Sequence, residues 1–261
     1  MRPCHNASMV GGRCHFGWGP AGALDLIRRE GCSLVAIVDV LSFSTTVSVA
    51  TTRGISIVPA APDRARQIAS ERGIPLAGEV RAGTPESPWS LAPSRMMSAP
   101  IVPEVVLASP NGSAIAAAAT GSLTPIRVVV ACLRNRTAAA NWLAAAASRD
   151  GAEMAVIAAG ERWPDGTLRP AVEDLIGAAA LIEVLGDLGL AVTPEAALAA
   201  RCIAGLIPAD LGALVHQAMS AGELRDRGYA EDVRIATQVD VAVGTPVLLA
   251  SGAFVEEIGP R

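Results

Sequence analysis

Apolar and polar residues follow one another in a repeating order along the chain: a short apolar run, a polar turn, then a longer segment with helical spacing. The clearest apolar run covers residues 35–38 and is followed by Asp39. A continuous run of this length suits a strand that is buried on both faces of a sheet. Because helical segments separate such runs, the pattern predicts a mainly parallel sheet with helices on its faces. We expect further strands at residues 14–18, 55–59, 74–77, 105–108, 127–133 and 154–159.

The last third of the chain departs from this alternation. Only helices are expected at residues 194–228, and segments 245–251 and 254–258 are expected to form a closing hairpin. Residues 82–103 contain five prolines and predict a long ordered loop, which at that length usually shapes a site or a partner surface. No linker marks a domain boundary. We therefore predict one α/β domain over residues 1–261, with three α/β/α layers and a mainly parallel, mixed sheet; two closely packed lobes are the alternative.

Polar side chains recur where the predicted strands end. Open α/β sheets bind ligands at the edge where the carboxyl ends of their strands meet. Carboxylates at such an edge suit a hard cation, whereas amides, hydroxyls and helix N-termini suit anionic oxygens. Glu173 and Asp174 follow the fifth strand, in the first turn of a helix. The other strand ends are expected to carry Asp39, Ser44, Thr45, Glu79, Asn111, Ser113 and Asn135 to this edge.

Each of these features also has a structural explanation. Asp39 can cap the helix that follows it, and Asn111-Gly112 is a common tight-turn sequence. Glu173 and Asp174 suit the positive end of a helix dipole wherever they occur. Their shared position after successive strands favours a common site.

Residue types and motifs that the chain lacks exclude several catalytic mechanisms. The chain has no lysine, which excludes Schiff-base catalysis and the phosphate-binding lysine of a P-loop. No cysteine is followed by arginine at the spacing of a thiolate phosphatase loop, and no Gly-x-Ser-x-Gly elbow is present. His216 lies on an amphipathic helix, where a structural role is favoured over catalysis. A hydrolase with this composition would depend on carboxylates, a divalent metal and arginines.

Composition predicts a soluble, cytoplasmic protein that binds neither membrane nor nucleic acid. A net charge of −4 without a basic cluster gives no footprint for nucleic acid. The mean hydropathy is +0.40, yet the longest apolar runs fall far short of the roughly 18 residues of a membrane-spanning helix. The N-terminus has no apolar signal region. Five widely spaced cysteines argue against a disulfide framework, and their spacing is not that of a zinc site.

An ordered set of motifs resembles the 2-phosphosulfolactate phosphatase (ComB-like) family. No single motif is very specific, but their order matches from about residue 35 to residue 246. The resemblance implies a magnesium-dependent acid phosphatase with an α/β fold. The family reaction releases phosphate from 2-phosphosulfolactate to give sulfolactate, a step in coenzyme M synthesis. The motifs are Asp39-Val40-Leu41, Ser44-Thr45-Thr46, Gly78-Glu79, Ser87-Pro88, Ser109-Pro110-Asn111-Gly112-Ser113, Asn135, Ala159-Gly160, Glu173-Asp174, Asp232 and Asp240.

Two departures from the family pattern bear on the substrate. Ser42-Phe43 stands where the family usually has Arg-Ala, and Ser109-Pro110 stands where it usually has Thr-Thr. Losing an arginine removes a charge-assisted anion contact worth about 1.5–3 kcal/mol. Arg81, Arg134 or Arg136 are the candidates to replace it.

With this resemblance we expect the following site. Mg²⁺ would be held by carboxylates among Asp39, Glu173, Asp174 and Asp232, with Glu79 as a further candidate. Arg81 would stabilise the transition state, and one of Asp39, Glu79 and Asp174 would activate water. Direct attack by Asp39 through an acyl phosphate is the alternative route. The expected substrate-binding residues are Ser44, Thr45, Thr46, Asn111, Gly112, Ser113 and Asn135.

Two other functions remain open on the sequence. The chain could hydrolyse another small acidic phosphoester with a metal, since Ser42 removes a family anion ligand. It could also be a non-catalytic paralogue that binds small anions. The expected partner in each case is a small phosphorylated organic acid, and the long apolar helices are compatible with a homodimer.

Overall fold

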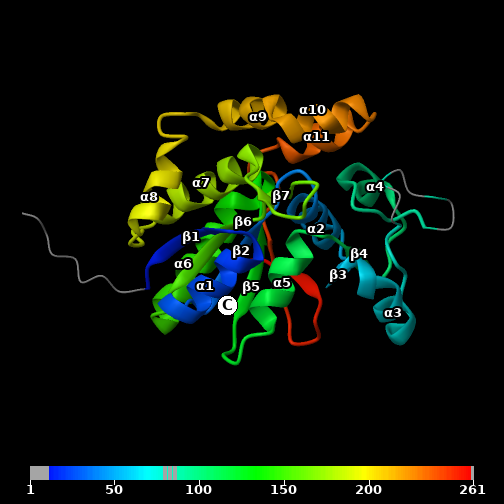
Figure 1. The fold of residues 1–261 in the computed structure, drawn as a ribbon, viewed down its shortest axis with the longest axis horizontal. Helices are drawn as coiled ribbons and strands as arrows, with labels where there is room; N and C mark the ends of the chain where they lie inside the picture. The colour runs from blue at the N-terminus through cyan, green and yellow to red at the C-terminus, as the bar shows by residue number, and fades with distance from the viewer. Residues whose placement is uncertain (1–11, 79–80, 82–83, 85–86, 260–261) are drawn as a thin grey trace, which may run out of the picture.

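A computed structural model describes residues 12–78, 81, 84 and 87–259. Its main feature is an eight-stranded sheet with strand order β1-β6-β2-β5-β9-β10-β3-β4 (Figure 1). Strands β1, β6, β2 and β5 pair in parallel, as do β3 and β4, whereas the β9–β10 hairpin is antiparallel to both of its neighbours. The strands are β1 (Cys14–Trp18), β2 (Leu34–Val38), β3 (Ser56–Ala60), β4 (Glu104–Ala108), β5 (Arg127–Ala131), β6 (Met154–Ala158), β9 (Thr245–Leu248) and β10 (Phe254–Glu257).

Helices cover both faces of this sheet, so the predicted three-layer α/β/α fold with a mainly parallel, mixed sheet is confirmed. The segment after β6 adds a small two-stranded sheet of β7 (Glu161–Arg162) and β8 (Leu168–Arg169). The prediction of one domain over residues 1–261 stays a prediction, because part of that range lies outside the described residues. The helices are α1 (Gly19–Glu30), α2 (Phe43–Thr52), α3 (Pro62–Arg72), α4 (Pro93–Ser98), α5 (Gly112–Thr120), the 3₁₀ turn η1 (Leu133–Asn135), α6 (Arg136–Asp150), α7 (Val172–Asp187), α8 (Pro194–Arg201), α9 (Pro208–Gln217), α10 (Met219–Asp226) and α11 (Ala230–Ala236).

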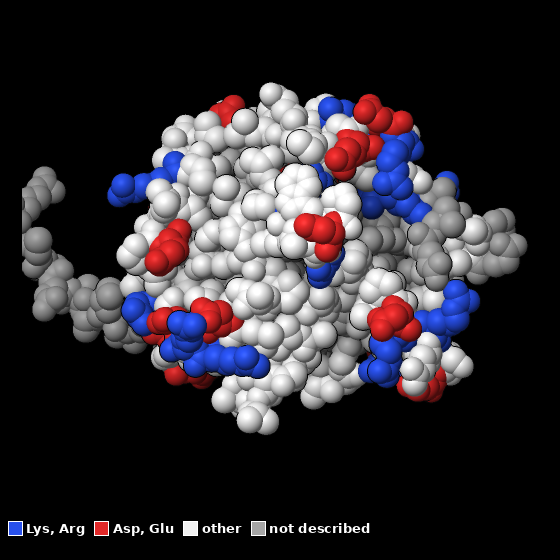
Figure 2. Space-filling model, viewed as in Figure 1, with Lys and Arg blue, Asp and Glu red and all other residues white. Residues whose placement is uncertain are grey.

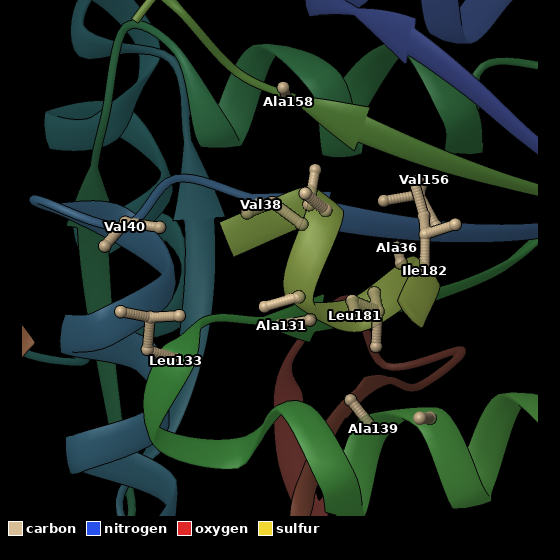
Figure 3. Packing of buried hydrophobic residues seen from close by; sticks show 14 of the residues in the cluster. Ala36, Val38, Val40, Ala131, Leu133, Ala139, Val156, Ala158, Leu181 and Ile182 are labelled. Atoms are coloured by element: carbon tan, nitrogen blue, oxygen red, sulfur yellow. The ribbon is translucent and has the colours of Figure 1, made fainter. Parts of the chain in front are cut away.

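Alternate residues of β2 feed two separate hydrophobic clusters, as the two-residue period of a strand requires. Ala36 and Val38 point to the face covered by α6 and α7, where they pack with Leu181 and Ile182 (Figure 3). Ile37 points to the opposite face and joins the cluster under α1, α2 and α5. The continuous apolar run of β2 is therefore explained by burial on both sides.

Three sequence-based elements differ from the structure. The strand expected at 127–133 ends at Ala131, and Leu133 begins the 3₁₀ turn η1. Residues 74–77 do not form a strand: Leu76 makes only an isolated bridge to Val106. Pro75 explains this, since proline has no N–H to donate to a sheet ladder. The expected loop at 82–103 contains helix α4, which begins with Pro93 in the first turn, where a missing N–H costs no hydrogen bond.

Charged side chains are distributed in small mixed groups on the face seen in Figure 2, and much of its centre is uncharged. None of the helices in the described part of the chain is long and apolar enough to cross a membrane.

Candidate active site

The loop that follows β2 holds Asp39 below the protein surface, with 7% of its area exposed. The backbone N–H of Phe43, the first residue of α2, donates to Asp39 Oδ1 at 3.1 Å. Ser44 Oγ accepts from the Asp39 N–H at 2.9 Å and donates to the Ile37 carbonyl at 3.0 Å. These bonds turn the chain sharply from strand to helix and fix Asp39 at the carboxyl end of β2.

Asp174 joins two strand ends. In the first turn of α7, its Oδ1 accepts from the Val40 N–H at 2.7 Å and its Oδ2 accepts from the Gly160 N–H at 2.8 Å. Val40 follows β2 and Gly160 follows β6, so Asp174 holds the two loops together. The preceding Glu173 is also buried, with 2% exposed, and accepts no hydrogen bond from any residue that the structure describes.

Glu161 was not among the residues that the sequence predicted for the site, yet it lies beside them. It begins β7 just after β6, and its Oε2 accepts from Asn111 Nδ2 at 3.1 Å, at the start of α5. Both side chains line a cavity of about 300 Å³, together with Trp18 and Arg162. Glu161 follows a strand end, as Asp39 does, and this position is the signal that could have identified it.

Burial and neighbouring negative charge raise the pKa of three carboxylates at this edge, Asp39, Asp174 and Glu161. Burial, with the charges of Glu161 and Glu173, raises the pKa of Asp39 to about 7, against hydrogen bonds that lower it. Burial, then the charges of Asp39 and Glu173, raises the pKa of Asp174. Burial and the charge of Glu173 also raise the pKa of Glu161, although the hydrogen bond from Asn111 opposes the shift. A cation or a bound proton would relieve this repulsion.

Arg81 contacts the loop that follows Asp39. Its Nη1 donates to Ser42 Oγ at 3.0 Å and its Nη2 to the Leu41 carbonyl at 3.1 Å. Its Nε donates at 2.9 Å to Asp232 Oδ2, and its guanidinium lies 5.5 Å from the centre of the Tyr229 ring. The structure therefore places an arginine at Ser42, the position where the sequence pattern lacks one.

The predicted hydroxyl and amide residues are buried at this edge, but most of their side-chain donors have internal partners. Thr45 Oγ1 donates to the Val40 carbonyl at 2.6 Å, and Thr46 Oγ1 to the Leu91 carbonyl at 2.9 Å. Asn135 bonds the backbone of Cys132 and Val130, and Ser113 Oγ donates to the Leu107 carbonyl. Since a hydroxyl has one O–H to donate, these groups shape the loops here. Their contact with a substrate stays a prediction.

Gly112 allows α5 to approach α2. A Cβ atom at Gly112 would lie 2.2 Å from Phe43 Cδ1, which is far inside van der Waals contact. Any side chain at this position would push the start of α5, and with it Asn111, away from Glu161.

The expected metal ligands do not all meet. Asp232 is occupied by Arg81 and by the Ser94 N–H at 3.0 Å, and Glu79 lies outside the described residues. Within the described part of the chain, no three or more His, Cys, Asp and Glu residues are placed so that they could hold a metal ion together. Mg²⁺ is usually bound by only one or two carboxylates plus waters and substrate phosphate. Asp39 and Glu173 are close enough for the charge of Glu173 to act on Asp39, and binding of Mg²⁺ by this pair stays a prediction.

Buried carboxylates and arginines gather at the carboxyl ends of a mainly parallel sheet, which is the edge where α/β proteins bind ligands. Comparison with known proteins gives the family. The model of the 2-phosphosulpholactate phosphatase family matches residues 25–249. A protein of Thermus thermophilus described as a probable 2-phosphosulfolactate phosphatase is 30% identical over 218 residues, which cover 82% of this chain and 87% of that protein. The chain belongs to the 2-phosphosulpholactate phosphatase family, as the motifs predicted.

Proposed function

We propose that this protein hydrolyses the phosphate ester of 2-phosphosulfolactate to sulfolactate and phosphate, in a reaction that depends on Mg²⁺. Family membership supports a phosphatase, and the relative supports the substrate. The observation that carries the proposal is the group of Asp39, Glu161 and Glu173, whose charges act on one another at the strand ends beside Arg81.

Asp39 and Glu173 are the carboxylates that we expect to hold Mg²⁺. Glu173 accepts no hydrogen bond from the described residues, and the Asp39 carboxylate accepts only from the backbone N–H groups of Phe43 and Ser42 among them, so both have lone pairs to offer. Asp174 is a poorer ligand, because both of its oxygens already accept backbone N–H groups. When bound, the cation would neutralise charge on the phosphoryl oxygens.

A carboxylate with a pKa near 7 can both accept and release a proton at neutral pH, which is what a general base needs. Asp39 would fill this role through an oxygen that does not hold the cation; burial, which raises its pKa to about 7 when no cation is bound, favours proton uptake there. It would take a proton from the attacking water, and Arg81, at Ser42 Oγ, would stabilise charge that develops on the phosphate. If Asp39 instead attacked phosphorus directly, ¹⁸O from labelled water would enter its carboxylate during a single turnover.

The direct test is release of phosphate from 2-phosphosulfolactate by the full-length protein. We expect turnover with Mg²⁺ and its loss after chelation, with recovery when Mg²⁺ is restored. No phosphate release at any Mg²⁺ concentration would refute the proposed function.

One observation favours a second candidate, a phosphatase of another small acidic ester. Arg81 has its three nitrogens engaged by Asp232, Ser42 and Leu41, so it offers fewer free donors than an arginine at position 42 would. A panel of phosphate esters assayed beside 2-phosphosulfolactate separates the two candidates, because the preferred substrate has the highest kcat/KM.

A further inference from the structure

Arg134 lies at the same sheet edge as Asp39, in the turn that follows the neighbouring strand. Val38 and Ala131 are partners in the parallel pair β2–β5, so Asp39 and Cys132 leave the sheet side by side. Arg134 follows two residues later, within η1. The edge that carries the carboxylates therefore also carries this guanidinium.

The charge of Arg134 has no ionic partner in the described part of the chain. Arg134 is 7% exposed, and its Nη1 donates to two neutral acceptors, the Ile235 carbonyl and the side-chain oxygen of Gln238. Its Nε is buried with no hydrogen-bond partner, and its Nη2 donates to none of the described residues. Burial lowers the pKa of Arg134, which reports the cost of keeping this cation away from water.

Two nearby arginines differ in this respect. Arg81 forms an ion pair with Asp232 at 2.9 Å, and Arg136 forms one with Asp240 at 2.8 Å. Arg81 and Arg136 are thus each neutralised by a carboxylate. Of these three arginines, Arg134 alone has no such partner among the described residues. A buried charge without a counter-charge is costly and is retained where a ligand completes the pair.

A structural role explains only part of this arrangement. The carbonyl of Ile235 lies near the C-terminal end of α11, where a cation is favourable to the helix dipole. That contact uses Nη1 and leaves Nε and Nη2 without acceptors. The two unused donors are the part that a helix-capping role leaves unexplained.

We propose that Arg134 binds the second acidic group of the phosphorylated substrate, a carboxylate or a sulfonate. Asp232, which holds Arg81, and Ile235, which accepts from Arg134, are three residues apart on α11, or about 4.5 Å along its axis. The Arg81 guanidinium thus lies beside Ser42, in the loop that follows Asp39. The Arg134 guanidinium contacts α11 about one helical turn further along. This spacing suits a small molecule in which an acidic group lies a few bonds from the phosphate. The assignment of the ligand rests on the proposed function.

Calorimetric titration with sulfolactate, the product without its phosphate, tests this assignment on the full-length protein. Arg134→Met is expected to weaken binding about 10- to 150-fold, the loss typical of a hydrogen bond to a charged group. Arg134→Lys keeps the charge but not the planar fork, so it should weaken binding less. Arg136→Met removes a neighbouring arginine that already has a partner, and it should bind within about twofold of the wild type. Lactate and isethionate, titrated separately, distinguish recognition of the carboxylate from recognition of the sulfonate.

Kinetics separate this inference from the proposed function. Isopropyl phosphate has the same secondary ester without either acid, so Arg134→Met should leave its kcat/KM unchanged while reducing that of 2-phosphosulfolactate. Three outcomes would overturn the inference. The first is an equal loss of kcat/KM on both esters. The others are sulfolactate binding by Arg134→Met or Arg134→Lys as tight as that of the wild type, and no sulfolactate binding by the wild type. If the wild type binds sulfolactate through Arg134 yet releases no phosphate, the proposed function fails and the inference stands. Thermal melting of each variant identifies losses that come from misfolding.

Discussion

Acidic side chains at the two ends of the central sheet have different neighbours. At the amino end, two acidic groups have basic partners: His15 Nε2 lies 2.8 Å from Glu153 Oε2, and Arg127 lies 2.5 Å from Asp150. At the carboxyl end, the carboxylates of Asp39, Glu161, Glu173 and Asp174 act mainly on one another.

The proton affinities follow this difference. Although burial raises it, hydrogen bonds from His15 and Arg13 lower the pKa of Glu153 below its usual value. The pKa of Asp39 is instead raised to about 7, first by burial and then by Glu161. The paired carboxylate of Glu153 at the amino end therefore stabilises the folded state, whereas the buried carboxylate of Asp39 at the carboxyl end destabilises it. Perturbed carboxylates that cost stability are typical of functional sites.

The largest effect is expected from Glu173→Gln. The neutral amide cannot offer the lone pairs and charge that a cation needs, so kcat for phosphate release should fall at least about 100-fold. Glu183→Gln, on the same helix, is the matched control and should keep wild-type kcat. Wild-type turnover by Glu173→Gln would remove this carboxylate from the site.

Asp39→Asn should separate stability from activity. Because the pKa of Asp39 is raised to about 7 from 3.8, the folded state holds a proton that the unfolded state releases between those values. With a chelator present, the unfolding free energy of the wild type should therefore fall by a few kcal/mol between about pH 4 and pH 7. The unfolding free energy of the variant should not show this fall. Urea unfolding across this range measures the difference, and parallel curves for the two proteins would contradict it.

Gly177→Ala tests how closely α7 must approach β2. A Cβ atom at Gly177 would lie 2.5 Å from Val40 Cγ2 and 2.9 Å from Val38 Cγ1. The overpacking should cost about 1–3 kcal/mol of unfolding free energy. Gly186→Ala, on the same helix with nothing near its added methyl, should be neutral or stabilising. Equal melting temperatures for the two variants would show that α7 has room to move.

Glu153→Gln sharpens the comparison from the other end and has the smallest effect. It removes a charge-assisted partner of His15 and Arg13, so unfolding free energy at pH 7 should fall by about 1 kcal/mol. The lowered pKa of Glu153 means that its contribution is present above the pKa of the unfolded state and disappears as the pH falls through the folded value. Urea unfolding at pH 3 and pH 7 should show a difference at the higher pH only.

The sequence predicted the fold and the position of two buried carboxylates at the carboxyl edge of the sheet. Asp39 was found because a continuous apolar run ended in a carboxylate, and Asp174 because an acidic pair opened a helix after another such run. Glu161 lies beside these carboxylates but was not predicted there, because the two-residue strands β7 and β8 are too short to give a periodic signal.

Contacts between distant segments could not be read from the sequence. Arg81 meets Asp232 across 151 positions, and no local pattern encodes that pairing. The hydroxyls of Thr45 and Thr46 were expected to face a ligand, but whether a hydroxyl meets a ligand or a carbonyl depends on how the loops pack.

The central claim is that the carboxylates at the carboxyl end of the sheet perform the reaction. It is tested most directly by phosphate release from 2-phosphosulfolactate at pH 7.5 with Mg²⁺, measured in parallel for the wild type, Asp39→Asn and Glu153→Gln. We expect Asp39→Asn to lose activity about 100-fold or more while folding at least as stably as the wild type, and Glu153→Gln to retain full kcat. Wild-type activity in Asp39→Asn would contradict the account.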